Sequence, residues 1–185
     1  MPCRIFALTT KWFPCWNDLG CGHPHFLTVF RQYLCDFKPN LVTILEPLIS
    51  GGRANAFIAA TGFDRSHCIE AVGFSGGIWL CWRRKIHVDI LLNHFQFIHC
   101  RISITCGKFS TLATIIYASP NATKRKQLWP HLRSLVGNIT SPWIMFGDFN
   151  PTFTASDRMN ATISTRPCKH FQDFVYDFSI RDMGF

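Results

Sequence analysis

The stretch Pro142-Trp-Ile-Met-Phe-Gly-Asp-Phe-Asn150 decides how this sequence is interpreted, because an apolar strand ends there in two polar side chains. On an extended backbone, residues two apart point to the same side, so Asp148 and Asn150 share one side of the strand's carboxyl end. A phosphodiesterase needs such a pair: a carboxylate to orient a water or hold a metal ion, and an amide to hydrogen-bond a phosphate oxygen. The alternative is an ordinary turn, since Gly-Asp-Phe-Asn-Pro is rich in turn-forming residues.

Outward from this stretch, short apolar runs alternate with turn residues and helical segments. Apolar spacing predicts helices over 26–37, 53–60, 123–136 with a kink at Pro130, and 170–178. Strands are expected over 12–16, 41–45, 67–72, 77–82, 88–92, 97–104, 111–117 and 143–146. The strands between 67 and 117 follow each other closely, which favours antiparallel pairing. Many strands with a few helices between them indicate an α/β sandwich of two sheets flanked by helices.

Composition favours one folded domain whose positive charge is concentrated in its middle. The chain has 185 residues, of which 48% are hydrophobic, and this excludes a disordered protein. Residues 51–135 hold eleven basic and three acidic groups, a net charge of +8, with runs at Arg83-Arg84-Lys85 and Lys124-Arg125-Lys126. Such a distribution suits an anionic partner such as nucleic acid, and a solvated basic face is the alternative.

The nine cysteines and the start of the chain indicate a protein of the cell interior. No cysteine pair has the spacing of a metal site, so we interpret the cysteines as mostly buried, reduced thiols. The first residues are apolar but are interrupted by Arg4, Lys11 and two prolines, and we therefore expect neither a signal peptide nor a membrane span. The expected location is intracellular, with the nucleus as one option.

Gly147-Asp-Phe-Asn150 and five other segments, in the same order along the chain, resemble the endonuclease/exonuclease/phosphatase superfamily, also called DNase-I-like. Besides Gly147-Asp-Phe-Asn150, the matching segments are Cys15-Trp-Asn-Asp-Leu-Gly20, Lys38-Pro-Asn-Leu-Val-Thr-Ile-Leu-Glu46, Gly73-Phe-Ser-Gly-Gly-Ile-Trp-Leu-Cys-Trp82, Ile116-Tyr-Ala-Ser-Pro120 with Arg125 and Leu128-Trp129 after it, and Asp182-Met-Gly-Phe185. The sequence is most similar to endonuclease domains of plant LINE-type non-LTR retrotransposons. The resemblance implies a four-layer α/β sandwich over residues 12–185, with residues 1–11 as an N-terminal extension.

The resemblance also implies roles for five residues. Glu46 would bind a divalent cation, Mg²⁺ or Mn²⁺, and Asn17 would help to position the metal or the phosphate. Tyr117 would hydrogen-bond the scissile phosphate, Asp148 would orient the attacking water, and Asn150 would bind the phosphate in the transition state. Without the resemblance, we would interpret Glu46 as a solvated carboxylate at a strand end, Asn17 as a turn residue and Tyr117 as a tyrosine of the core or of a sheet edge.

Two features of the segment 73–82, its glycines and its tryptophans, receive a structural interpretation. Gly73, Gly76 and Gly77 precede a strand, which is more typical of a turn or bulge than of a phosphate-binding loop. Trp79 and Trp82 lie three apart, so they are expected on opposite faces of that strand, with at least one of them in the core.

The resemblance further predicts that the domain is incomplete at its C-terminus. Members of the family carry a later Ser-Asp-His motif that supplies an active-site base and a metal-site carboxylate, and this sequence does not contain it. Loss of one member of a cooperating catalytic set can lower the rate by a factor on the order of 10⁴–10⁶. We therefore expect little or no nuclease activity from these 185 residues.

Three functions remain open from the sequence. The first is a divalent-metal-dependent DNA endonuclease domain of retrotransposon origin. The second is a non-catalytic remnant that binds nucleic acid through its basic middle region. The third is a phosphatase-like enzyme that acts on small phosphoesters. DNA is the expected partner, and neither a membrane nor a protein partner is predicted.

Overall fold

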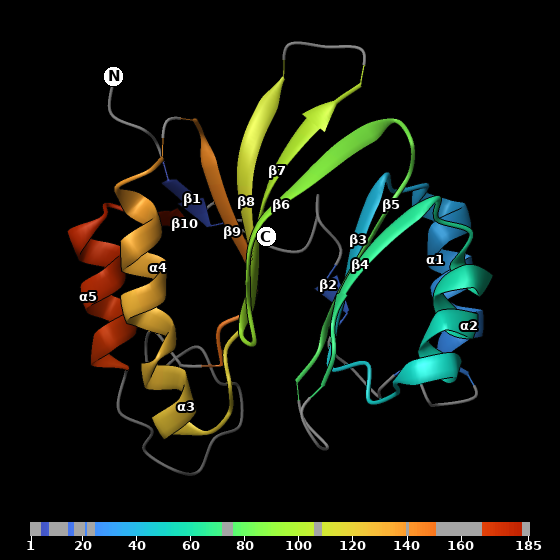
Figure 1. Cartoon of the computed structure of the whole chain (residues 1–185), viewed down its shortest axis with the longest axis horizontal. Helices are drawn as coiled ribbons and strands as arrows, with labels where there is room; N and C mark the ends of the chain where they lie inside the picture. The colour runs from blue at the N-terminus through green and yellow to red at the C-terminus, as the bar shows by residue number, and fades with distance from the viewer. Residues whose placement is uncertain are drawn as a thin grey trace.

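The computed structural model describes residues 5–7, 15–16, 21, 25–71, 76–105, 109–139, 141–150 and 168–182. Within these residues, two β-sheets pack face to face and helices cover both outer sides (Figure 1). The layers therefore run helix, sheet, sheet, helix, which is the four-layer α/β sandwich that the sequence predicted.

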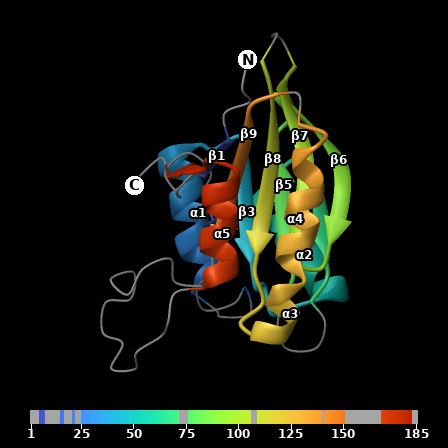
Figure 2. The ribbon, with the colours of Figure 1, turned by 90° about the vertical axis from the view of Figure 1, so that its left-hand side faces the viewer.

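The larger sheet has six strands within the described residues, in the order β10-β1-β9-β8-β7-β6. Its members are β1 (Ile5–Ala7), β6 (Ile86–His94), β7 (Phe97–Ile104), β8 (Ser110–Tyr117), β9 (Trp143–Asp148) and β10 (Arg181–Asp182). Strands β6, β7 and β8 form an antiparallel meander, whereas β8 and β9 run parallel. Helices α4 (Leu128–Val136) and α5 (Lys169–Asp177) cover the outer face of this sheet (Figure 2).

The smaller sheet has four strands in the described part of the chain, in the order β2-β3-β5-β4. Its members are β2 (Cys15–Trp16), β3 (Leu41–Leu45), β4 (Arg65–Ile69) and β5 (Ile78–Trp82), and β3 and β5 are antiparallel. Helices α1 (Phe26–Phe37) and α2 (Gly51–Thr61) cover its outer face. None of the helices in the described ranges is long and apolar enough to cross a membrane.

Alternate residues of each central strand contact different layers. Ile115 and Tyr117 of β8 pack against the facing sheet, whereas Ile116 packs beneath α4 and α5. Trp79 and Trp82 of β5 divide in the same way, as the sequence predicted. This two-residue period places Tyr117 between the sheets at the carboxyl end of β8.

The prediction of a helix over 123–136 with a kink at Pro130 was wrong in one respect. The segment forms two helices, α3 (Ala122–Lys126) and α4, which meet at Gln127. Pro130 has no N–H, and its ring clashes with a helical carbonyl four residues earlier, which here is that of Lys126. The helix therefore breaks before the proline, and Pro130 lies in the first turn of α4, where a missing N–H costs nothing.

Other elements follow the sequence closely, with small differences at their ends. Helix α1 and strand β7 have the predicted bounds, and β9 extends beyond the predicted end at 146 to include Asp148. Strand β1 falls within the expected N-terminal extension, yet it pairs in parallel with β9 and β10. A three-residue strand is too short for its alternation to be recognised in a sequence.

Candidate active site

Two strands that belong to different sheets bring a tyrosine and a glutamate into contact. Tyr117 ends β8 and Glu46 directly follows β3, and the Tyr117 hydroxyl donates a hydrogen bond to the Glu46 carboxylate Oε1. The two residues are 71 positions apart in the sequence. Tyr117 is buried and Glu46 is half-buried. The site therefore lies between the sheets, at the shared carboxyl end of β3 and β8.

The backbone around Glu46 turns sharply where β3 ends. Glu46 adopts a left-handed conformation, with φ of 48°, and its N–H donates to the Gly77 carbonyl at 3.2 Å. Gly77 has φ of 91°, and a Cβ there would lie 3.0 Å from Cδ of Pro47. This close approach supports the structural interpretation of Gly77. A larger residue would displace Pro47 and with it the neighbouring Glu46.

Asp148 lies beside Tyr117 in the larger sheet. The two residues are register partners in the parallel β8–β9 ladder, and the Ala118 N–H donates to the Asp148 carbonyl at 2.7 Å. Gly147, just before Asp148, has φ of 127°, and a Cβ there would lie 2.0 Å from the Ile116 carbonyl oxygen. Only glycine fits this position, so Gly147 fixes where Asp148 emerges from the sheet.

Asn150 joins the same group of residues after the chain has turned. Its N–H donates to Oδ1 of Asp148 at 2.7 Å, and its side-chain Nδ2 donates to the Ala118 carbonyl at 2.6 Å. With φ of 54°, Asn150 closes an Asx-type turn. The turn interpretation and the active-site interpretation are therefore compatible: the turn holds the Asn150 amide in place and leaves its second N–H for another acceptor.

Electrostatics keep Tyr117 in its protonated form. Burial raises the pKa of the Tyr117 phenol well above its usual range, and the hydrogen bond to Glu46, the Glu46 charge and the Asp148 charge raise it further. A hydrogen bond from the Gly76 backbone acts in the opposite direction. At neutral pH the hydroxyl is thus a hydrogen-bond donor directed at anionic oxygen.

Sequence reasoning missed Gln96, which connects the site to the turn between β6 and β7. Gln96 is only 1% exposed. Its backbone carbonyl accepts from the Tyr117 N–H at 2.9 Å, its Oε1 accepts from the Ser119 N–H at 2.8 Å, and its Nε2 donates to the Lys124 carbonyl at 3.0 Å. A polar residue in a two-residue turn is normally exposed, and no sequence signal identified this one as buried.

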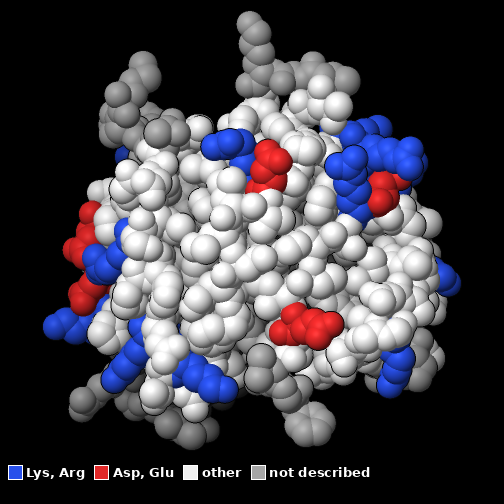
Figure 3. Space-filling view, viewed as in Figure 1, with Lys and Arg blue, Asp and Glu red and all other residues white. Residues whose placement is uncertain are grey.

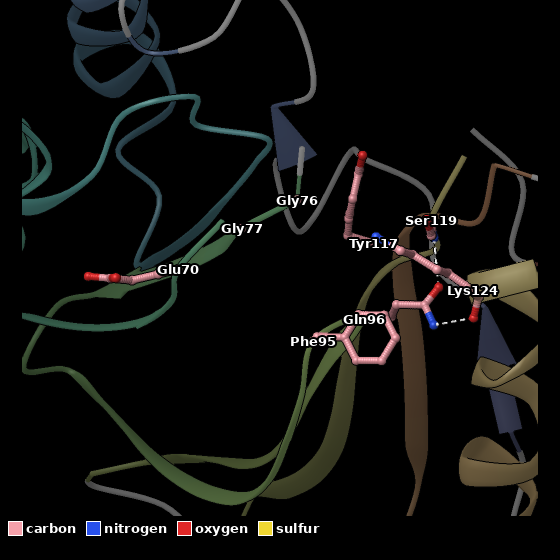
Figure 4. A pocket seen from close by; sticks show the side chains of 8 residues that line it. All are labelled: Glu70, Gly76, Gly77, Phe95, Gln96, Tyr117, Ser119 and Lys124. Atoms are coloured by element: carbon pink, nitrogen blue, oxygen red, sulfur yellow. Dashed lines mark hydrogen bonds between the residues drawn. The ribbon is translucent and has the colours of Figure 1, made fainter. Parts of the chain in front are cut away.

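A small pocket opens beside Tyr117, with a volume of about 40 Å³ (Figure 4). It is lined by Glu70, Gly76, Gly77, Phe95, Gln96, Tyr117, Ser119 and Lys124. Figure 4 shows the Gln96 side chain between Ser119 and Lys124, with its two hydrogen bonds drawn. The pocket therefore joins the Tyr117 end of β8 to the start of α3.

The two basic runs lie at opposite ends of the molecule. The Arg83 N–H donates to the Asn40 carbonyl, next to the amino end of β3, whereas Lys124 and Lys126 belong to α3, beyond the carboxyl end of β8. On the face shown in Figure 3, Lys and Arg form small groups toward the rim and the centre carries little charge. Of the two basic runs, the one in α3 therefore lies near the site, where Lys124 lines the pocket beside Tyr117.

The fit of a divalent cation depends on Glu46. Within the described ranges, no group of three or more His, Cys, Asp and Glu residues could hold a metal ion. Mg²⁺ usually keeps several waters and is bound through one or two carboxylates together with substrate phosphates, and Glu46 is compatible with that mode. Asn17, the other residue predicted to help here, lies outside the described residues.

Solved structures share this arrangement of layers. An AP endonuclease from Leishmania major superposes with a TM-score of 0.67 over 89% of this chain and 65% of its own, at 13% identity. The fold is DNase-I-like. An AP endonuclease from Archaeoglobus fulgidus gives a TM-score of 0.57 over 79% of this chain and 60% of its own, at 15% identity. TDP2 from D. rerio, complexed with a single-strand DNA product, gives 0.51 over 89% of this chain and 63% of its own, at 12% identity.

These similarities concern structure, and each covers less than two thirds of the related chain. No protein-family model matches the sequence, and no curated protein matches it either. The comparisons therefore show the DNase-I-like fold. The substrate and the role of each site residue have to be argued from the residues themselves.

Proposed function

We propose that this chain is a divalent-metal-dependent phosphodiesterase domain that cleaves the DNA backbone. The observation that carries the proposal is the convergence of Glu46, Tyr117, Asp148 and Asn150 at one end of a DNase-I-like fold. Two carboxylates, a protonated phenol and an amide are the groups needed to activate water and bind a phosphate. The same four residues are those to which the sequence resemblance assigns roles at the site.

Each group has a distinct task in this proposal. Glu46 would hold Mg²⁺ or Mn²⁺, which supplies Lewis-acid stabilisation of the phosphate when bound. The Tyr117 hydroxyl donates a hydrogen bond to a non-bridging phosphate oxygen once the Glu46 carboxylate is engaged by the cation. The Asp148 carboxylate accepts a proton from the attacking water. Asn150 donates its second amide N–H to the phosphate without adding negative charge near an anionic substrate.

We also propose a retrotransposon origin for the domain. The support is in the sequence, where the blocks at 73–82 and 118–129 resemble LINE-type endonucleases more than phosphatase-like members of the superfamily. An intracellular and nuclear setting would follow from that origin, since the substrate is genomic DNA. Fusing the chain to a fluorescent protein and imaging it in plant cells tests the location, and exclusion from the nucleus would count against this origin.

A non-catalytic DNA-binding role is the second candidate. Two observations favour it. Within the described residues, no group of three or more His, Cys, Asp and Glu residues could hold a metal ion, and the Glu46 carboxylate already accepts a hydrogen bond from Tyr117. Because the sequence resemblance also predicts a catalytic set that lacks one member, turnover far below that of an efficient nuclease is expected even if the first proposal holds.

A nicking assay separates the two candidates. Supercoiled plasmid is incubated with Mg²⁺ and either the wild-type chain, Asp148→Asn, or the control Asp36→Asn, which removes an exposed carboxylate on α1. Loss of a positioned base lowers a rate by roughly 10²–10⁴-fold. We expect metal-dependent nicking that Asp148→Asn abolishes and Asp36→Asn preserves. Equal nicking by all three proteins, or salt-dependent binding without nicking, would overturn the enzymatic proposal.

A further inference from the structure

The turn between β6 and β7 presents an exposed aromatic ring next to the site. Its two residues are Phe95 and Gln96, and Phe95 is 42% exposed although Gln96 beside it is fully buried. Phe95 lines the same pocket as Tyr117 and Lys124, and its ring stands at the pocket edge (Figure 4). Exposing a phenylalanine costs hydrophobic free energy, so this ring is available to a ligand at the point where DNA would lie.

The ring is held in place by its neighbours. The His94 ring packs against it, with 4.4 Å between ring centroids. On its other side, Gln96 is fixed by its contacts with Tyr117, Ser119 and Lys124. A preorganised ring loses little conformational entropy when a ligand stacks on it, which favours binding.

The cationic residue Lys124 lines the same pocket as Phe95. The backbone of Lys124 is held by Gln96 and by the Asn121 side chain, while its side chain is exposed. Among the described residues, Lys124 takes part in none of the ion pairs that the structure contains. The anionic Glu70 also lines the pocket but stands apart from Lys124 (Figure 4), which favours a phosphate near the lysine.

We propose that Phe95 and Lys124 form a subsite for an unpaired nucleotide next to the scissile phosphate, with its base stacked on Phe95 and its phosphate on Lys124. This inference rests on the proposed function, because it places the strand relative to Tyr117. The pocket, at about 40 Å³, is too small to enclose a base, so the base lies on the outer face of the ring. A base stacked in this way has left its duplex, so the subsite selects single-stranded or frayed DNA over intact duplex.

Equilibrium binding without cleavage tests the subsite. Fluorescence anisotropy in EDTA compares a labelled single-stranded oligonucleotide with one of the same length made of abasic tetrahydrofuran units. The variants are Phe95→Ala, Phe95→Trp and Lys124→Gln. The controls are Phe109→Ala and Lys85→Gln, which remove an exposed phenylalanine before β8 and an exposed lysine at the β5–β6 turn, both at the far end of the molecule.

The expected results separate stacking from charge. Phe95→Ala weakens binding of the base-containing strand about tenfold and leaves the abasic strand unchanged, whereas Phe95→Trp retains the affinity. Lys124→Gln weakens both strands and lowers the salt slope by about 0.7. The Phe109 and Lys85 controls bind as the wild type does.

Equal losses on both strands in Phe95→Ala, or equal effects in the two controls, would overturn the subsite. A Phe95→Ala protein that melts earlier and is not rescued by Phe95→Trp would also contradict it, because the ring would then serve only the fold. The assay contains no metal and no cleavage step. If the chain binds the two strands with different affinities but never nicks a plasmid, the proposed subsite is supported and the proposed enzymatic function is wrong.

Discussion

Replacing Gly147 by alanine is predicted to destabilise the chain because two separate costs meet at one residue. Its φ of 127° lies in a region that L-residues rarely adopt, and a Cβ there would come within 2.0 Å of the Ile116 carbonyl oxygen. The conformation alone costs about 1–3 kcal/mol. Moving the β8 backbone away costs about 1–3 kcal/mol more, as overpacking of a filled core does.

The combined loss of about 2–6 kcal/mol is a large part of the roughly 5–15 kcal/mol that stabilises a typical domain. For a domain of this size, each kcal/mol shifts the melting temperature by about 2–4 °C. Gly147→Ala should therefore melt about 10 °C below the wild type, as measured by circular dichroism. Nicking should also fall, because the shift moves Asp148 relative to Tyr117.

Two other glycines supply matched controls. Gly62 has φ of 73° with nothing within 4 Å of an added Cβ, so Gly62→Ala carries the conformational cost alone, about 1 kcal/mol. Gly137 has φ of −61° and equally open space, so Gly137→Ala should stay within about 0.5 kcal/mol of the wild type. If Gly147→Ala melts within about 2 °C of Gly62→Ala, the backbone clash does not exist and the reasoning about Asp148 is refuted.

Three further predictions concern groups around the site and the core. Tyr117→Phe should preserve the fold and reduce nicking roughly 10²-fold. Because burial raises the pKa of Tyr117, the tyrosinate absorbance that appears only well above pH 10 should decrease by one tyrosine in this variant, and the stability of the wild type should fall as the pH rises beyond 10. Burial lowers the pKa of His94 and of His99 to about 4, so between pH 6.5 and pH 4 the unfolded chain binds more protons than the folded chain. The urea concentration at the unfolding midpoint should therefore fall as the pH drops from 6.5 toward 4. A midpoint that does not change over that range would contradict the assignment of both histidines as neutral in the folded protein. Gln96→Met leaves the Ser119 N–H without its acceptor, whereas the Lys124 carbonyl keeps the Gln127 N–H as a donor. Denaturant unfolding should show a loss of about 2 kcal/mol, and a loss below about 0.5 kcal/mol would mean that water replaces the amide.

Local patterns in the sequence predicted most of the elements. The Phe26–Phe37 helix and the Phe97–Ile104 strand follow directly from apolar spacing, since each buries a continuous stripe or face. The break before Pro130 was misplaced because the proline acts on the carbonyl four residues earlier. Strand β1 went unrecognised because three residues carry too little pattern, and its pairing depends on distant partners.

For the site too, the sequence predicted some features and not others. Glu46, Tyr117, Asp148 and Asn150 were selected by resemblance, but no local pattern places Glu46 against a tyrosine from the other sheet. That contact depends on how the two sheets pack, which is a property of the whole core. Gln96 was missed for the same reason, because its burial depends on the loop after β8 folding back onto the β6–β7 turn.

The most direct test of the central claim asks whether Glu46 and Asp148 act as one site. Metal-dependent nicking rates are measured for the wild type, Glu46→Gln, Asp148→Asn and the double variant, each purified in parallel. Residues that act as a unit have strongly non-additive effects. The account predicts that each single change removes nearly all nicking, and that the double variant is slower than the slower single variant by less than about threefold. If the rate losses of the two single changes multiply in the double variant, or if Asp148→Asn nicks at the wild-type rate, the account is contradicted.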